Sequence, residues 1–304
     1  MNKPLRIGTR DSALAVWQAN TLQERLAELG IASTLVPIKS QGDLDLKQPL
    51  YEMGVTGIFT KALDIALLNH EIDLAIHSMK DVPTQLPKGI VQAAVLERGP
   101  VEDVMVWKNK EAKEKKERII ATGSLRRKAQ WKSKNPKDQV VNLRGNIQTR
   151  LEKLHSNNWD GAIFAAAALE RLEISQEMIE PLSYVLPAPA QGALVVVCHL
   201  ADEDIAQQLT LLNDRESEVC TQIERDFLRT LEGGCTAPIG ALAKVEGSIV
   251  HFSGGLYSLK GSEAKTIEAE FPIGEAKDKG KSLGLELLRS GGDVLMKEFK
   301  AAHE

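Results

Sequence analysis

Arginines stand beside small hydroxyl or amide residues at three points where a strand pattern gives way to a helix pattern. These points are residues 8–12 (Gly-Thr-Arg-Asp-Ser), 121–127 (Ala-Thr-Gly-Ser-Leu-Arg-Arg) and 143–150 (Leu-Arg-Gly-Asn-Ile-Gln-Thr-Arg). A capped helix start offers unpaired N–H groups and the positive end of the helix dipole, and guanidinium groups bind carboxylate or phosphate bidentately. Three such junctions favour a polyanion site over scattered surface arginines. The sequence has no P-loop and no Gly-x-Gly-x-x-Gly turn, so a nucleotide is not the favoured anion.

A polar segment, residues 77–83 (His-Ser-Met-Lys-Asp-Val-Pro), directly follows the apolar residues Ala75 and Ile76. Lys80 and Asp81 are therefore expected at the carboxyl end of a strand, which is the edge where α/β sheets bind ligands. The residues alone leave a second interpretation open. In that interpretation Lys80 and Asp81 form a surface turn, and His77 packs by hydrogen bonding.

The three cysteines differ in their surroundings. Cys198 ends an apolar strand pattern and Cys220 lies on the apolar side of a helix pattern, so both are expected to act as small apolar residues. Cys235 follows two glycines, which favour an exposed loop. A thiol there can be a nucleophile, but no Cys-His pair accompanies it. Its own chemistry therefore leaves open whether Cys235 reacts.

Length and composition restrict the class of protein. The 304 residues exceed what one hydrophobic core usually serves, so two or three domains are expected. A formal net charge of -4 gives little support to nucleic-acid binding. The first residues lack the apolar segment of a signal peptide, and no stretch reaches the roughly 18–20 apolar residues that span a bilayer. The cysteine spacing suits no disulfide framework and no zinc site. We therefore expect a cytoplasmic protein with no metal and no membrane segment.

Strand and helix patterns alternate along most of the chain, which predicts mostly parallel sheets covered by helices. Strands are expected at residues 5–7, 34–38, 73–76, 119–120, 140–141, 162–165 and 193–198, and helical faces at 15–29, 59–67, 125–131, from 146, 214–231 and 283–295. The Lys- and Glu-rich residues 108–118 favour a solvated surface helix or loop over a basic partner-binding segment. The last ninety residues read as a small α+β domain.

Five segments together resemble the hydroxymethylbilane synthase (porphobilinogen deaminase) family. They are residues 77–83, 124–127 (Ser-Leu-Arg-Arg), 143–146 (Leu-Arg-Gly-Asn) with Thr149 and Arg150, 191–193 (Gln-Gly-Ala) and 231–235 (Leu-Glu-Gly-Gly-Cys). The resemblance implies an α/β fold with two periplasmic-binding-protein-like domains forming a hinged cleft, plus a smaller C-terminal α+β domain. The domains would be residues 1–96 with 193–211, residues 99–187 and residues 215–304.

The resemblance also implies an activity in tetrapyrrole and haem biosynthesis. A transferase of this family condenses four porphobilinogen molecules head-to-tail, releases ammonia each time, and then hydrolyses the chain to hydroxymethylbilane. Condensation starts on a dipyrromethane cofactor, for which the resemblance implies a thioether to Cys235. It assigns catalysis to Asp81 and implies a monomer. The acetate and propionate groups of porphobilinogen would meet a set of basic and polar residues: Arg10, Ser12, Ser78, Lys80, Thr122, Ser124, Arg126, Arg127, Arg144, Arg150, Arg171 and Gln191.

The sequence departs from the family pattern at three places. Thr56 stands where a loop lysine is common, Gly123 where serine is usual, and Thr236-Ala237 where Gln-Val commonly follows the cysteine. None of these changes touches Asp81 or Cys235, so activity is still expected. The alternative from another class is a non-catalytic two-domain protein that binds polycarboxylates.

Overall fold

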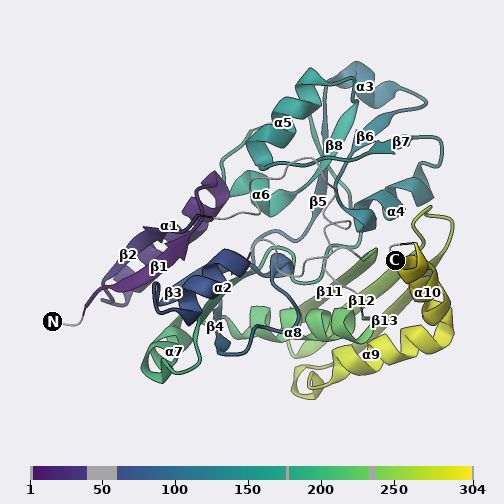
Figure 1. Cartoon of the computed structure of the whole chain (residues 1–304). Helices are drawn as coiled ribbons and strands as arrows, with labels where there is room; N and C mark the ends of the chain where they lie inside the picture. The colour runs from purple at the N-terminus through teal and green to yellow at the C-terminus, as the bar shows by residue number, and fades with distance from the viewer. Residues whose placement is uncertain (1–2, 40–59, 176–177, 233–236, 303–304) are drawn as a thin grey trace. The chain divides into compact units, whose positions relative to one another are not determined.

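The computed structural model describes residues 3–39, 60–175, 178–232 and 237–302, which Figure 1 draws in colour. These residues form two compact units. Of the described residues, the first unit contains 3–39, 60–99 and 192–218, and the second contains 100–191 and those from 219 onward. No helix in the described ranges is both long enough and apolar enough to cross a membrane.

The first unit is built on a five-stranded sheet of order β2-β1-β3-β10-β4. Its strands are β1 (Leu5–Thr9), β2 (Ser33–Pro37), β3 (Leu74–Ser78), β4 (Ile90–Val95) and β10 (Leu194–His199). Strands β1, β2 and β3 pair in parallel, whereas β10 runs antiparallel to both β3 and β4. The mostly parallel sheet expected from the sequence is therefore confirmed, with β10 as its reversed strand.

Helices cover both faces of this sheet. Helices α1 (Ala13–Glu28) and α7 (Glu203–Leu209) share a core with Ile7, Leu74 and Val196. Helix α2 (Lys61–Leu68) lies against the other face, where a Cβ atom on Gly8 would be 2.9 Å from Leu63 Cδ2. The apolar residues of α1 recur at helical spacing, so one stripe of this helix is buried.

The second unit contains another five-stranded sheet, of order β7-β6-β8-β5-β9. Its strands are β5 (Asp103–Trp107), β6 (Ile119–Ala121), β7 (Gln139–Val141), β8 (Gly161–Ala165) and β9 (Ile179–Pro181). The helices α3 (Lys110–Glu114), α4 (Leu125–Lys134), α5 (Ile147–Ser156) and α6 (Ala166–Glu170) follow the strands. Most residues of α3 are exposed, which confirms a surface helix in the charge-rich segment. Strands β4, β5 and β9 were not predicted from the sequence.

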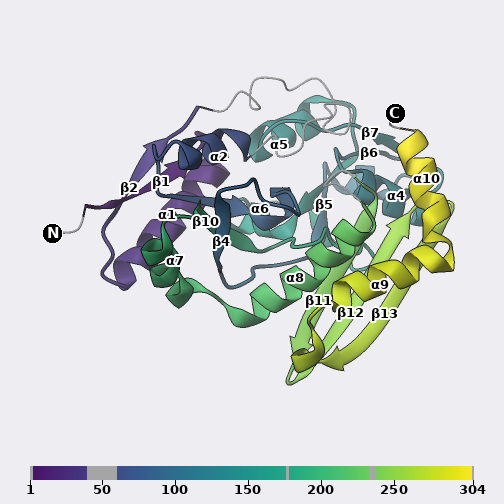
Figure 2. The ribbon, with the colours of Figure 1, turned by 60° about the horizontal axis from the view of Figure 1, so that its bottom comes forward.

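The end of the chain forms a three-stranded antiparallel sheet of β11 (Ile239–Glu246), β12 (Ile249–Tyr257) and β13 (Ala264–Pro272). Figure 2 shows α8 (Arg215–Thr230) and α9 (Lys279–Leu287) running across this sheet. Phe227 of α8 meets Phe252 of β12 edge-on, with ring centroids 5.2 Å apart. This small α+β region agrees with the sequence prediction.

The prediction of a single final helix near residues 283–295 is wrong. A π-helical segment, Leu288–Gly292, separates α9 from α10 (Asp293–Ala301). Gly291 has a φ of 101°, which is incompatible with a continuous right-handed helix. The apolar spacing continues through the break, so periodicity alone did not reveal it.

Candidate active site

The first arginine-bearing junction joins β1 to α1. Strand β1 ends at Thr9, and the side chain of Ser12 caps α1 by accepting a hydrogen bond from the Ala15 N–H at 3.4 Å. Ser12 is thus the N-cap that its residue type predicts. Arg10 is half-buried between the strand and the helix start. The junction therefore combines a guanidinium group with the positive end of a sixteen-residue helix.

The segment carrying Asp81 follows β3 directly. A single 3-10 turn, Met79–Asp81, continues from the last strand residue, Ser78. Met79 is buried, and its N–H donates to the Ala193 carbonyl at 3.0 Å. Ser78 Oγ accepts a hydrogen bond from Gln18 Nε2 at 2.8 Å. These contacts fix the turn on the sheet and leave Asp81 half-buried at its edge.

One cavity in the first unit brings predicted residues of these two segments together. Arg10, Ser12, Ser78 and Asp81 all line it. Their position at the carboxyl ends of β1 and β3 is the one that a ligand takes in an open α/β sheet. Lys80 belongs to the same turn but does not line the cavity. The sequence thus predicted the position of both segments.

The cavity is also lined by Gln18 and His77, which were not predicted as site residues. Burial lowers the pKa of His77 to about 4, and the nearby positive charge of Arg10 adds to this effect. His77 is therefore neutral at pH 7. Gln18 could have been noticed, because it is a polar residue on the buried stripe of α1 beside Ala15, Ala19 and Leu22.

The second junction, in the other unit, joins β6 to α4. Ser124 caps α4 by accepting a hydrogen bond from the Arg127 N–H at 3.4 Å, and Thr122 Oγ1 accepts one from the Ser124 N–H at 3.2 Å. A Cβ atom on Gly123 would lie 2.6 Å from the Leu143 carbonyl oxygen. A residue with a Cβ atom at this position would require the Leu143 carbonyl to move.

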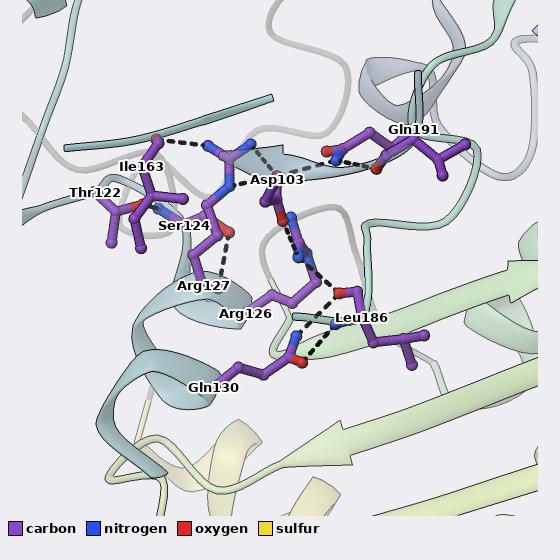
Figure 3. A network of polar contacts seen from close by, with 10 residues as sticks. Asp103, Thr122, Ser124, Arg126, Arg127, Gln130, Ile163, Leu186 and Gln191 are labelled. Atoms are coloured by element: carbon purple, nitrogen blue, oxygen red, sulfur yellow. Dashed lines mark hydrogen bonds and ion pairs between the residues drawn. The ribbon is translucent and has the colours of Figure 1, made fainter. Parts of the chain in front are cut away.

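Arg126 and Arg127, in the first turn of α4, are both buried and both bind Asp103 of β5 (Figure 3). Burial alone would raise the pKa of Asp103, but the charges and hydrogen bonds of the two arginines outweigh it and hold this pKa well below its usual range. Gln191 Nε2 also donates to Asp103, at 3.0 Å. The structure therefore brings three predicted binding residues together through an aspartate that the sequence reasoning missed.

The third junction joins β7 to α5. Asn146 caps α5 by accepting a hydrogen bond from the Thr149 N–H at 2.9 Å. Arg150 Nε donates to the Gly145 carbonyl at 2.7 Å, and Lys153 Nζ donates to the Arg144 carbonyl at 3.0 Å. Arg144 itself is buried. The cap prediction is confirmed at all three junctions.

Two predicted site residues remain, Arg171 and Cys235. Arg171 directly follows α6, and burial lowers its pKa to about 10, with the negative charge of Glu170 opposing the shift. It therefore stays charged at pH 7. Cys235, Thr56 and Thr236 lie outside the described residues. Cys198 and Cys220 are buried free thiols, as expected.

Each unit, taken by itself, carries arginines that suit carboxylate groups. Arg10 lies at a capped helix start in one unit, and Arg126, Arg127 and Arg144 lie at capped helix starts in the other. Guanidinium groups beside helix N-termini are suited to carboxylates. Asp81 adds a carboxylate that can exchange protons with a ligand held by Arg10. The cavity of the first unit therefore suits acid–base chemistry on a bound carboxylate.

Comparison with known proteins gives the same picture. Residues 5–207 match the family model described as "Porphobilinogen deaminase, dipyromethane cofactor binding domain", and residues 219–289 match the porphobilinogen deaminase C-terminal domain. The chain is 40% identical over 270 residues to the porphobilinogen deaminase of Chloroherpeton thalassium, covering 87% of this chain and 86% of that one. It is 39% identical to the Syntrophomonas wolfei protein of that name, over 97% of this chain and 99% of the relative.

Among solved structures, an ancestral cationic amino acid solute binding protein aligns with a TM-score of 0.45 and 14% identity, over 69% of this chain and 87% of that one. So distant a likeness carries no functional argument. The non-catalytic polycarboxylate-binding alternative is not favoured, because the two family models together cover both described units. The chain belongs to the porphobilinogen deaminase family.

Proposed function

We propose that the chain is a porphobilinogen deaminase, which condenses four porphobilinogen molecules head-to-tail on a covalently bound dipyrromethane cofactor. Each condensation releases ammonia, and hydrolysis of the finished chain gives hydroxymethylbilane. The observation that carries this proposal is the cavity in which Arg10 and Asp81 lie together at the carboxyl ends of β1 and β3. A cation that binds a substrate carboxylate and a carboxylate that moves protons are the two groups this condensation requires.

Cys235 is the proposed attachment point of the cofactor, through a thioether. The cofactor supplies the free pyrrole α-carbon with which the first substrate condenses. Its acetate and propionate groups suit the three arginine-bearing junctions, because each junction joins a guanidinium group to a helix start. The proposed binding set is Arg10, Ser12, Ser78, Lys80, Thr122, Ser124, Arg126, Arg127, Arg144, Arg150, Arg171 and Gln191.

Asp81 is the proposed catalytic residue. Loss of ammonia from the aminomethyl group of porphobilinogen leaves an electron-poor pyrrole, and a carboxylate beside its N–H stabilises the developing positive charge. The protonated carboxyl group can give its proton to the departing amine. The resulting carboxylate can then collect the proton that the attacking α-carbon loses as its ring becomes aromatic again. One residue thus returns to its starting state in each cycle.

We further propose three domains: residues 1–96 with 193–211, residues 99–187 and residues 215–304. The three sheets support this division, because each sheet takes all of its strands from a single one of these ranges. The second range shares one compact unit with residues 219–304 of the third, so these parts are expected to unfold together. We expect the protein to act in the cytoplasm as a monomer.

Substitution of Asp81 tests the catalytic assignment. The variant Asp81→Ala should fold and keep its cofactor, but its rate of ammonia release from porphobilinogen should fall by about 10²-fold or more, because both proton transfers lose their group. The control is Asp202→Ala. Asp202 is also half-buried, but it follows β10 and so lies at the opposite edge of the same sheet from Asp81. This control should keep the wild-type rate. Near-normal turnover by Asp81→Ala would refute the role of Asp81.

A further inference from the structure

Asp103 lies at the centre of a closed network in the second unit (Figure 3). Its side chain has 0% exposure, and it accepts hydrogen bonds from three residues. Arg126 Nη1 donates to Oδ2 at 2.6 Å, whereas Arg127 donates to Oδ1 from Nε at 3.0 Å and from Nη2 at 2.6 Å. Gln191 Nε2 completes the set at 3.0 Å. A carboxylate with this many partners holds all of them in one arrangement.

The network also fixes the direction of each arginine. Arg126 Nη1 makes a second bond, to the Leu186 carbonyl at 2.7 Å, so both of its N–H groups are engaged. Arg127 Nη1 donates to the Ile163 carbonyl at 3.1 Å. Within the described ranges, the hydrogen bonds of Arg126 all come from Nη1. Its Nε and Nη2 groups therefore remain to bind a carboxylate from outside the network.

The charges of the two arginines are a second reason why Asp103 is needed, besides its hydrogen bonds. Arg126 and Arg127 are neighbours in the chain, and both are buried. Burial makes the largest contribution to lowering the pKa of Arg126; the charge of Asp103 opposes this lowering, and repulsion by Arg127 adds to it. One carboxylate between two guanidinium groups leaves a single net positive charge. The pair can thus stay ordered and charged when no ligand carboxylate is present.

We propose that Asp103 is a positioning residue for the binding of substrate and cofactor carboxylates. It orients the guanidinium groups of Arg126 and Arg127 and neutralises one of their two charges, so that the remaining charge attracts a ligand carboxylate in a fixed geometry. Gln191 supports Asp103 from the segment before β10, where it also donates to the Val101 carbonyl at 2.7 Å. The inference rests on the proposed function, since it assumes that Arg126 and Arg127 bind these carboxylates.

The same unit offers a matched control in Asp138. This aspartate is also buried, accepts a hydrogen bond from Trp131 Nε1 at 3.0 Å, and forms an ion pair with Arg118 at 2.9 Å. It belongs to none of the proposed binding positions. Asp103→Asn and Asp138→Asn therefore both remove a buried, ion-paired carboxylate, but only the first removes it from the proposed binding site.

The test compares wild type, Asp103→Asn and Asp138→Asn by intact mass, thermal unfolding and steady-state kinetics with porphobilinogen. Both variants should unfold at lower temperature than wild type, because Asp103→Asn leaves two buried arginines and Asp138→Asn leaves the half-buried Arg118 without their carboxylate partner. Only Asp103→Asn should also show incomplete cofactor loading. In its loaded fraction, KM should rise by about tenfold or more while kcat changes little, because the lost interaction orients the ligand and does not touch the reacting atoms.

A wild-type KM together with full cofactor loading in Asp103→Asn would overturn the inference. An increase of KM in Asp138→Asn as large as that in Asp103→Asn would overturn it too. A wild type that neither carries the cofactor nor consumes porphobilinogen would overturn the proposed function and this inference with it. If Asp103→Asn does not fold, Asp103→Glu decides the question, since it keeps all three charges and moves the carboxylate by one methylene group. A raised KM in Asp103→Glu supports the positioning role, and an unchanged KM refutes it.

Discussion

His77, in β3, stands two residues before the turn that carries Asp81, and it lines the same cavity. Its motif drew attention to it, but the sequence could not tell whether the imidazole is charged, because charge depends on burial by residues distant in the chain. Burial lowers the pKa of His77 to about 4, and Arg10 adds to the shift. The neutral ring thus places no second positive charge beside Arg10.

This lowered pKa predicts a pH dependence of stability. The unfolded chain takes up a proton on His77 near its ordinary pKa of 6.5, whereas the folded protein does so only near about 4. Stability should therefore fall as pH decreases from about 6.5 to about 4, by on the order of 3 kcal/mol from this residue. The variant His77→Gln should show a shallower fall in the unfolding temperature of the first unit over that range.

An exposed histidine provides the control for this measurement. His155 is exposed on α5, so His155→Gln should keep the wild-type dependence on pH. A His77→Gln variant whose unfolding temperature follows pH as steeply as that of wild type would contradict the assigned pKa of His77.

Asp103 shows where residue-level prediction fails. The three arginine-bearing junctions were visible in the sequence because capping residues and arginines are neighbours in the chain. Asp103 is separated from Arg126 by more than twenty residues, and only the pairing of β5 with β8 brings its strand into the sheet core. An aspartate before an apolar run also occurs on ordinary surfaces, so nothing local indicated that this one is buried and paired.

At the scale of elements, local signals predicted the junctions well and the sheet edges poorly. Ser12, Ser124 and Asn146 cap the helices that they were expected to cap. Strand β9 has only three residues and pairs at the edge of its sheet, so its sequence carries little periodicity. The break at Gly291 depends on one backbone angle, which apolar spacing does not report.

Gly145 allows a test of the third junction. It has a φ of 116°, and a Cβ atom there would lie 2.8 Å from Thr149 Cγ2 in the first turn of α5. Gly145→Ala should therefore destabilise the second unit by roughly 1–3 kcal/mol, because alanine is strained at this angle and crowds the helix start. Thermal or denaturant unfolding measures the change.

Gly274→Ala is the matched control, since a Cβ atom at Gly274 meets nothing within 4 Å and the residue has no positive φ. It should unfold like wild type. Equal stability of Gly145→Ala and Gly274→Ala would show that the backbone conformation at Gly145 does not hold the junction.

At the scale of the whole molecule, the acidic net charge concealed the local basic sites. A formal charge of -4 is a sum over 304 residues, whereas Arg126 and Arg127 lie together on one buried carboxylate. Alternation of strand and helix patterns was enough to predict two α/β regions and a small C-terminal one. It could not predict that residues 100–191 and the C-terminal region share one compact unit, because that depends on packing between them.

Clustered arginines predict that the cofactor stabilises the fold. Positive charges gathered without their ligand repel one another, and a tightly bound polycarboxylate removes that cost. Cys235→Ser and Cys235→Ala, which cannot form the thioether, should therefore unfold several degrees below wild type, and by the same amount as each other. Equal unfolding temperatures of wild type and both variants would contradict a stabilising cofactor.

The most direct test of the whole account is the intact mass of the purified wild-type protein beside that of Cys235→Ser. The proposed thioether at Cys235 predicts that wild type is heavier than its sequence by one dipyrromethane and that Cys235→Ser has the mass of the bare chain. Brief exposure to porphobilinogen should then add further substrate units to wild type alone. A wild-type protein with the mass of the bare chain before and after porphobilinogen, or an adduct that persists in Cys235→Ser, would contradict it.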